Sequence, residues 1–247
     1  MTRSRTLSYI GACVVLAACP QPRPPAPLVP VPLTPRERDS AIAWTRTTLP
    51  RTRATIRFRW RYQDEQVKHA GRGSARIAPP DSMRFDYAGP LGLGSGAAVV
   101  IGDSVLWADP EKNFRSLVPA IPMLWAALGM VRPPAEDAGV LGVVLVDSAA
   151  GRRRVVWRFA QVQDTIDYVA TDSAGRITVL EAEWRRRASR VARSRSALDT
   201  FQRAANARID FPSSREGGKG GGARFELTVV AIDTVAVLAP ALWRSRR

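Results

Sequence analysis

The sequence predicts a mainly β protein with helices, of the α+β class, built on one curved antiparallel sheet or barrel. Three observations favour it. Apolar and charged residues alternate with period two from residue 54 onward, which is typical of a half-buried strand. Similar short runs follow at regular spacing, separated by turn residues. Helical patterns are confined to one segment before the strands and another midway along the chain.

Residues 1–18 are typical of an export signal rather than of a folded element. Arg3 and Arg5 give a positive start, and the apolar run 7–18 is too short to span roughly 30 Å of hydrocarbon as a helix. The run ends in Leu-Ala-Ala-Cys, which matches the bacterial lipobox and predicts cleavage before Cys19 and lipidation of its thiol. An ordinary secretory signal that happens to contain a cysteine is the alternative.

Residues 19–35 are predicted to be a lipidated cysteine followed by a proline-rich tether. The stretch PQPRPPAPLVPVPLTP favours polyproline II, which extends about 3.1 Å per residue. The remaining range, 36–247, is expected to form one folded domain. The predicted mature chain has no cysteine besides Cys19, which excludes disulfides and cysteine-based zinc sites.

The chain carries a formal charge of +15. Such a surplus favours nucleic acid or an anionic membrane surface as a partner. Because an exported protein rarely meets nucleic acid, we expect the membrane surface and no nucleic acid.

Thr34 and Pro35 predict the N-cap and the first position of a helix that runs to about Leu49. The strand after it places Ile56, Phe58, Trp60 and Tyr62 on one face and three arginines on the other. Further strands are predicted at 73–78, 83–88, 97–101, 104–107, 155–161, 166–170, 177–184, 191–197, 207–211 and 225–232.

The segment 116–146 separates two blocks of strands. Its first part, 117–130, is almost wholly apolar and predicts a helix with proline-marked starts, and Pro133-Pro134 predicts a second short helix around 136–146. An apolar helix inserted midway through a sheet protein must bury itself against the sheet. We therefore expect a plug or lid over the concave face.

Several motifs in this arrangement resemble the LolA/LolB family of lipoprotein carriers, most closely LolB, the outer-membrane acceptor that is itself a lipoprotein. The strand Arg84-Phe85-Asp86-Tyr87-Ala88 leads into Gly89-Pro90-Leu91-Gly92, where the family has an Asn-Pro-Leu-Gly turn. Leu124-Trp125-Ala126-Ala127-Leu128-Gly129 is similar to the family's apolar helix, and 206–211 with 224–227 to its last strands. Gly89 replaces the asparagine, and a second leucine, Leu93, follows the turn.

The resemblance, over roughly residues 36 to 235, implies an open antiparallel β half-barrel capped by helices, with an apolar cavity for acyl chains. Candidate residues of the cavity and its lid are Phe58, Trp60, Tyr62, Phe85, Leu117, Ile121, Leu124, Trp125, Leu128, Trp157 and Phe159. The resemblance also implies a membrane-insertion loop, Pro90, Leu91, Gly92 and Leu93, whose Leu91 enters the bilayer during lipoprotein delivery.

The expected function is acceptance of lipoproteins and their insertion into the outer membrane, by a lipid-anchored monomer that faces the periplasm. Its partners would be membrane lipid through the acylated Cys19, the acyl chains of lipoprotein cargo, and a periplasmic carrier protein.

No catalytic residue, metal site or cofactor is predicted. His69, the only histidine, lies in a polar hairpin, and there is no Gly-x-Ser-x-Gly elbow. Neither glycine-rich stretch, 92–96 or 217–220, has the residues that a phosphate-binding loop needs. A hydrolase that uses carboxylates alone stays open.

The residues leave three further alternatives. The two leucines of the turn either contact lipid or cap an edge of the core. The inward aromatic residues line a cavity or fill a solid core, since both require apolar inward faces. The arginine run 184–193 is either a solvated hairpin face or a surface for anionic lipid or a protein partner. The competing function is therefore a structural or interaction lipoprotein with a solid core and an arginine-rich binding face.

Overall fold

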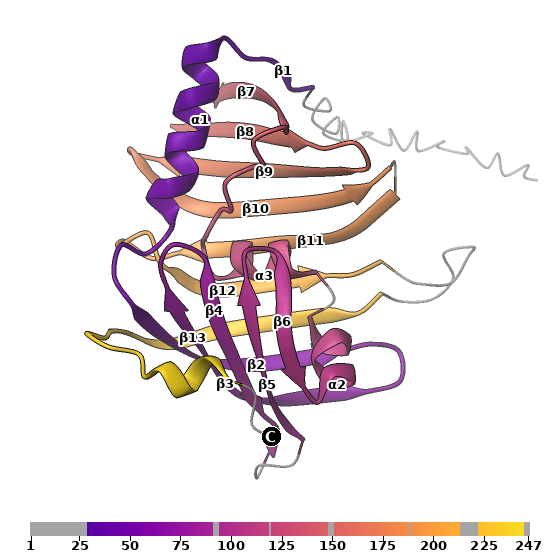
Figure 1. Ribbon diagram of the computed structural model, residues 1–247. Coiled ribbons are helices and arrows are strands. Elements are labelled where there is room, and N and C mark those ends of the chain that lie inside the picture. The colour runs from indigo at the N-terminus through magenta and orange to yellow at the C-terminus, as the bar shows by residue number, and fades with distance from the viewer. Residues whose placement is uncertain are drawn as a thin grey trace, which may run out of the picture.

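The computed structural model of the chain describes residues 29–90, 94–118, 120–147, 151–187, 189–212 and 222–244. Its strands form one antiparallel sheet in the order β1-β7-β8-β9-β10-β11-β12-β13-β2-β3-β4-β5-β6 (Figure 1). Because β1 and β6 lie at opposite edges, the sheet is open, as predicted. The strands are β1 (Val31–Pro32), β2 (Ala54–Gln63), β3 (Lys68–Ala78), β4 (Ser82–Ala88), β5 (Ser95–Ile101), β6 (Ser104–Asp109), β7 (Gly139–Asp147), β8 (Arg152–Ala160), β9 (Asp164–Ser173), β10 (Arg176–Arg186), β11 (Ser189–Leu198), β12 (Ala204–Asp210) and β13 (Arg224–Thr234).

The first predicted helix is confirmed as α1 (Pro35–Thr48). Thr34 and Glu37 form a capping box, in which the Thr34 amide donates to Glu37 Oε2 at 2.9 Å and the Glu37 amide donates to Thr34 Oγ1 at 3.4 Å. The buried residues of the helix are Ala41 and Thr45. Figure 1 shows α1 crossing in front of the ends of β7 to β10.

Alternation along β2 creates the inner and outer faces of the sheet. Ile56, Phe58 and Trp60 are buried, whereas the arginines between them are exposed. Across the sheet, Phe58 stacks on Phe85 of β4 with ring centroids 5.3 Å apart. The inward side chains therefore form one aromatic core on the concave face.

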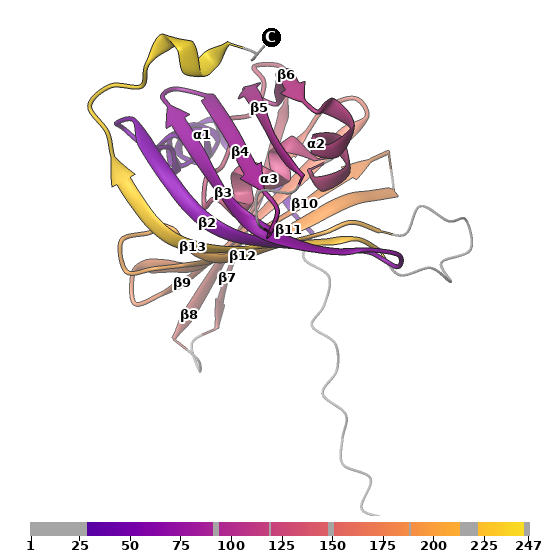
Figure 2. The same cartoon turned by 90° about the horizontal axis from the view of Figure 1, so that it is seen from below.

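Short helices fill the centre of the concave face, where a single helix over 117–130 was expected. The structure has α2 (Glu111–Leu117) and α3 (Ile121–Ala127), and every residue of α3 is buried. Figure 2 shows β2, β13 and β12 curving beneath α3. Two hydrogen bonds hold this helix: Trp125 Nε1 donates to the Gly102 carbonyl at 2.8 Å, and Ser196 Oγ donates to the Ala127 carbonyl at 3.2 Å. The segment is a plug rather than a cover over an empty concavity.

The second predicted helix, around 136–146, is wrong. Glu136 and Asp137 form a turn, and the residues after them are strand β7, paired with β8 from Gly139 to Asp147. The run Val-Leu-Gly-Val-Val-Leu-Val lacks alternation, and such a run fits a strand as well as a buried helix. Its β-branched valines favour the strand.

Strand β1 comes from the segment that the sequence predicts as tether. Val31 lies opposite Gly142 and Pro32 opposite Leu141. Within the described chain, no strand pairs with this edge of β7 beyond Gly142. Val144 and Val146 on that stretch are exposed.

A short 3-10 helix, η2 (Pro240–Trp243), follows the last strand. It rests on β4 and β6, because Trp107 Nε1 donates to the Trp243 carbonyl at 3.0 Å and the Arg84 guanidinium donates to the Leu242 carbonyl. Among the helices that the structure describes, none is long and apolar enough to cross a membrane. The predicted signal and most of the predicted tether lie outside the described residues.

Candidate functional site

A cavity of about 400 Å³ opens at one end of the half-barrel, and we call it the mouth cavity. It lies where β2 and β10 begin and where β3, β11 and β13 end, beside the last turn of α1. Its volume falls at the lower end of the range for ligand pockets, about 300–1,000 Å³. Apolar side chains form much of its wall: Trp44, Ile56, Ile77, Leu128, Met130, Leu180, Leu198 and Ile232.

Specific contacts hold the loops around the mouth cavity. The Gln202 side chain forms hydrogen bonds with both backbone groups of Ile177. Its Nε2 donates to the Ile177 carbonyl at 3.0 Å, and its Oε1 accepts from the Ile177 backbone N–H at 3.1 Å. Thr48 Oγ1 accepts from the Val131 amide at 2.8 Å, which joins the end of α1 to the chain that follows α3. The loop after β11 and the end of α1 are thereby both fixed at the opening.

Gly129, where the chain leaves α3, has φ +81°, a conformation that side-chain-bearing residues rarely adopt. A Cβ here would lie 3.2 Å from Leu198 Cδ2 and 3.3 Å from the Ala204 amide nitrogen. Glycine therefore allows the close approach of this turn to β11 and β12 that shapes the wall of the mouth cavity.

The rim of the mouth cavity is basic. Arg51 is exposed there and makes no ion pair with any residue that the structure describes. Arg203 is 3.0 Å from Asp199 and lies 4.7 Å from the centroid of the Phe201 ring. Partial burial alone would raise the pKa of Asp199, but hydrogen bonds from Arg203 and from the Phe201 amide hold it below its ordinary value. Asp199 is therefore ionised at neutral pH and occupies Arg203, which leaves Arg51 available to an anionic group.

A second cavity, of about 420 Å³, lies at the opposite end of the half-barrel. Trp60, Tyr62 and Tyr87 line it, and the Trp60 and Tyr87 rings meet edge to face with centroids 6.2 Å apart. Burial raises the pKa of Tyr87, an effect that the neighbouring Asn113 side chain partly offsets. This aromatic pocket is bordered by Gly89, Pro90 and Gly94.

The predicted cavity residues divide between these openings and the core. Trp60 and Tyr62 line the aromatic pocket, and Leu128 lines the mouth cavity. The others that are buried pack in the core: Phe58, Phe85, Ile121, Leu124, Trp125 and Phe159. Trp157 packs against that core while only partly buried, and Leu117 is the last residue of α2.

Of the predicted insertion loop, only Pro90 is described, and it is exposed at the border of the aromatic pocket. Leu91, Gly92 and Leu93 lie outside the described residues, as does Cys19.

Sequence reasoning missed most of the wall of the mouth cavity. Trp44 comes from α1, Leu180 from β10, Leu198 from β11 and Ile232 from β13. Inward alternation could have indicated that these strand residues face the core side. The alternation does not indicate that these residues lie at strand ends, where the packed core gives way to the mouth cavity.

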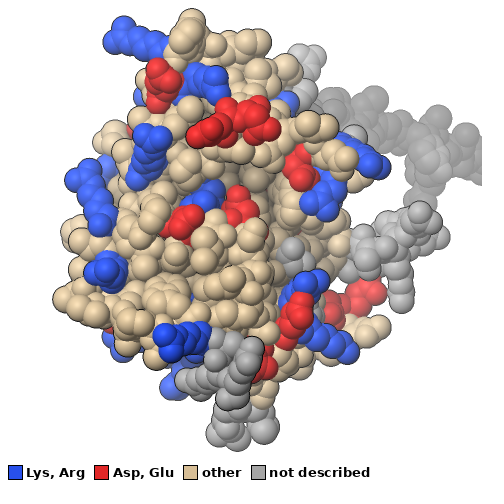
Figure 3. Space-filling view, in the orientation of Figure 1, with Lys and Arg blue, Asp and Glu red and all other residues tan. Residues whose placement is uncertain are grey.

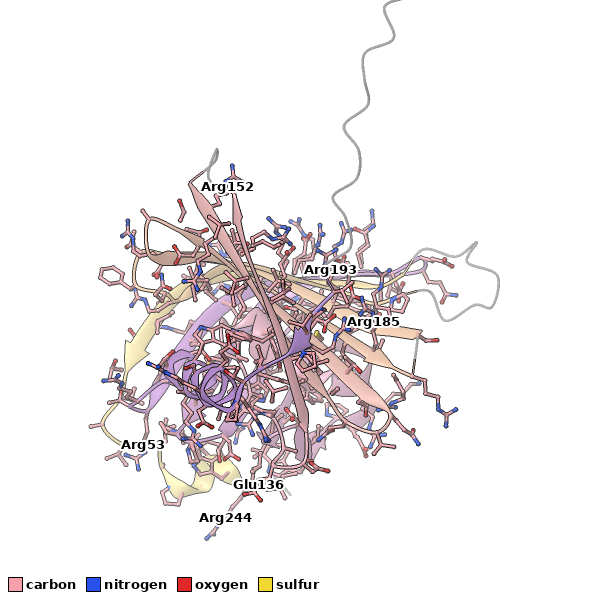
Figure 4. The ribbon with its side chains drawn as sticks, turned by 90° about the horizontal axis from the view of Figure 1, so that it is seen from above. Arg53, Glu136, Arg152, Arg185, Arg193 and Arg244 are labelled. Carbon is pink, nitrogen blue, oxygen red and sulfur yellow. The ribbon has the colours of Figure 1, made fainter. Side chains whose placement is uncertain are left out.

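The arginine run 184–193 is largely engaged in ion pairs. Arg186 lies 3.0 Å from Asp164, and Arg185 lies 3.1 Å from Asp167. Glu181 is bound by Arg193 at 2.9 Å and by Arg195 at 2.8 Å. Figure 4 shows Arg152 and Arg193 on the side of the sheet away from α1. On the face that carries α1, Figure 3 shows basic side chains scattered toward the margins rather than gathered in one patch.

His69 lies in β3 opposite Tyr62, and it is exposed at the border of the aromatic pocket rather than in a hairpin turn. Within the described ranges, no group of three or more His, Cys, Asp or Glu side chains is arranged to hold a metal ion.

Comparisons with known proteins give a likeness of fold. No protein-family model matches the sequence, and no curated protein does. A LolA superfamily protein from Nitrosomonas europaea has a similar solved structure, with a TM-score of 0.54 and 11% identity over 83% of this chain and 97% of that chain. A putative outer membrane lipoprotein-sorting protein domain from Vibrio parahaemolyticus has a TM-score of 0.48 and 10% identity over 84% of this chain and 97% of that chain. The chain thus shares the open antiparallel sheet and few helices of a LolA superfamily fold.

Proposed function

We propose that the protein binds an acyl chain, or another ligand with a long apolar part, in the mouth cavity, and that it takes part in lipoprotein sorting. The observation that carries this proposal is a cavity of about 400 Å³, walled in part by apolar side chains, that opens to solvent at one end of the half-barrel. Because α3 fills the centre of the concave face, the ligand would occupy the mouth rather than the whole concavity.

Apolar contact would supply most of the affinity. Burying a CH₂ group contributes about 0.8 kcal/mol, so that several methylenes are needed before binding exceeds the cost of association. Ile56, Leu128 and Leu180, themselves shielded from solvent, provide the deep wall for such a chain. A carboxylate or phosphate at the outer end of the ligand would meet Arg51 at the rim.

The LolB-like form of this function is a further part of the proposal. The lipobox supports lipidation at Cys19, and the proline-rich tether would hold the domain above the outer membrane on its periplasmic side. There the protein would accept lipoproteins from a periplasmic carrier, and Leu91 would enter the bilayer during insertion. Leu91→Glu should abolish transfer of lipoprotein into liposomes while cargo loading continues, and unchanged transfer would place Leu91 in the core instead.

Titration with a fluorescent fatty acyl probe tests the ligand. We would use the full chain with Cys19→Ser, so that no attached lipid competes for the cavity. Leu198→Trp adds bulk at the wall of the mouth cavity and should weaken saturable binding at least tenfold. The matched control is Leu106→Trp in β6, where Leu106 is 62% exposed and lies outside the cavity, and it should bind as the parent does.

Two results would contradict the proposal. The parent chain could show no saturable binding, or Leu198→Trp could bind with the parent's affinity while its circular dichroism and unfolding midpoint show that it is folded. Either result would favour a solid-core interaction lipoprotein.

A further inference from the structure

The outer face of β2 carries Arg57, Arg59 and Arg61, but these arginines differ in their surroundings. Arg57 lies 2.7 Å from Asp233, and Arg61 lies 3.9 Å from Glu226. Arg59 has no carboxylate partner among the residues described. On β13 its neighbour is Thr228, which carries no charge.

The neighbour of Arg59 on the other side is a second arginine. Arg72 of β3 lies directly opposite Arg59 in the register, and Ala88 of β4 lies opposite Arg72. Both arginines are exposed, and the Arg72 guanidinium, like that of Arg59, forms no ion pair or hydrogen bond with the described chain. Like charges directly opposite one another on a sheet face are destabilising. The register therefore places two like-charged side chains at neighbouring positions on one face, and an external anion bound between them would relieve their repulsion.

A groove of about 540 Å³ runs over this pair on the outer face of the sheet. Ser74 and Ala88 are among its lining residues, and their small side chains leave room beside the arginines. The groove also borders Asp86, the one carboxylate in its lining. Asp86 is already engaged by Arg76 and by the buried Arg84, which lies 2.9 Å from it.

The charge around the groove stays positive after these pairs are formed. Asp86 and Asp233 are the acidic partners, and the guanidinium groups that surround them outnumber them: Arg57, Arg59, Arg72, Arg76 and Arg84. Two features besides charge shape the site. The Ser74 side chain borders the groove, and Val230, at a bulge of β13 and 61% exposed, adds an apolar wall.

We propose that Arg59 and Arg72 form a binding site for the phosphate group of an anionic membrane lipid. Guanidinium groups bind phosphate oxygens in bidentate fashion, and two of them on adjacent strands can grip one phosphate together. A phosphate carried on a lipid is favoured over free phosphate because Val230 offers the apolar contact that only an amphiphile uses. This site lies on the face of the sheet opposite the core, so that it is independent of the mouth cavity.

Vesicle co-sedimentation tests this site. The full chain with Cys19→Ser would be mixed with vesicles of phosphatidylcholine alone and with vesicles that also contain phosphatidylglycerol. Each basic residue near an anionic surface contributes about fivefold in binding. Arg59→Gln/Arg72→Gln should therefore bind the anionic vesicles about 25-fold more weakly, whereas binding to phosphatidylcholine should be unchanged.

The matched control is Arg36→Gln/Arg46→Gln on α1, which removes the same charge from two exposed arginines that form no ion pair in the described chain. It should keep the parent's affinity. Equal losses in the two double variants, or equal binding of the parent to both kinds of vesicle, would overturn the site. A parallel titration with inorganic phosphate distinguishes the source: saturable phosphate binding without vesicle binding would overturn the lipid assignment.

Discussion

Replacing Trp125 with alanine should lower the free energy of unfolding by about 3–5 kcal/mol, the usual cost of removing a buried tryptophan. Trp125 has no exposed surface, lies at the middle of the wholly buried α3, and donates to the Gly102 carbonyl at 2.8 Å. Arg132 lies over its ring, 5.6 Å from the centroid. Truncation would therefore leave a cavity, an unpaired Gly102 carbonyl, and an Arg132 guanidinium without the aromatic ring that it lies over.

A milder change separates these contributions. Trp125→Phe keeps most of the ring and removes the donor, so that the cost should be about 1–3 kcal/mol, which is typical of leaving one buried polar group unpaired. For a domain of this size, 3–5 kcal/mol corresponds to a fall in the unfolding midpoint of about 6–20 °C. Thermal and denaturant unfolding followed by circular dichroism would measure both variants.

The refuting result is a loss below about 1 kcal/mol for Trp125→Ala. Such a small cost would mean that the indole is solvated for much of the time, and hence that α3 leaves the concave face. In that case the acyl ligand would bind beneath α3, and the mouth cavity would be only its outer end.

Three further perturbations test separate parts of the fold. Thr34→Ala removes the capping box of α1 and should cost about 1 kcal/mol in denaturant unfolding, whereas Ser40→Ala, further along the helix, should change little. Burial raises the pKa of Tyr168 above its ordinary value of 10.0, so that its contribution to stability is complete below pH 10.0 and is lost as the pH rises toward the folded-state pKa. Tyr168→Phe should therefore flatten the fall in the free energy of unfolding above pH 10.0, and an unchanged slope would contradict the burial. Arg72→Gln should raise stability by about 0.2–1 kcal/mol at low ionic strength, because it removes the repulsion with Arg59, and the gain should shrink in high salt.

The sequence predicted elements whose signal is local. The Thr34-Pro35 start of α1 follows from capping chemistry, and β2 follows from strict alternation of apolar residues with arginine. Turn residues separate the predicted strands 166–170 and 177–184, and two residues there, Ala174 and Gly175, adopt positive φ angles. In each case neighbouring residues fix the backbone without help from distant ones.

The misses have two physical causes. Strand β7 lacks alternation and therefore resembles a buried helix in periodicity. The wall of the mouth cavity joins Trp44, Leu198 and Ile232, which are far apart in the chain. Inward-facing residues beside a void and inside a packed core have the same composition, so that the position of the void depends on three-dimensional packing alone.

The short strand β1 limits self-association of the protein through the edge of its sheet. A strand edge with free amides and carbonyls can template pairing with another chain, and the stretch of β7 after Gly142 is such an edge in the described structure, with Val144 and Val146 exposed beside it. Pro32 of β1 has no amide hydrogen and cannot donate a hydrogen bond to an added strand. The part of the β7 edge that β1 covers therefore resists extension. Loss of the residues that form β1 would uncover the whole valine-rich strand, and preparations trimmed before Leu33 should form thioflavin-positive aggregates sooner than the intact chain.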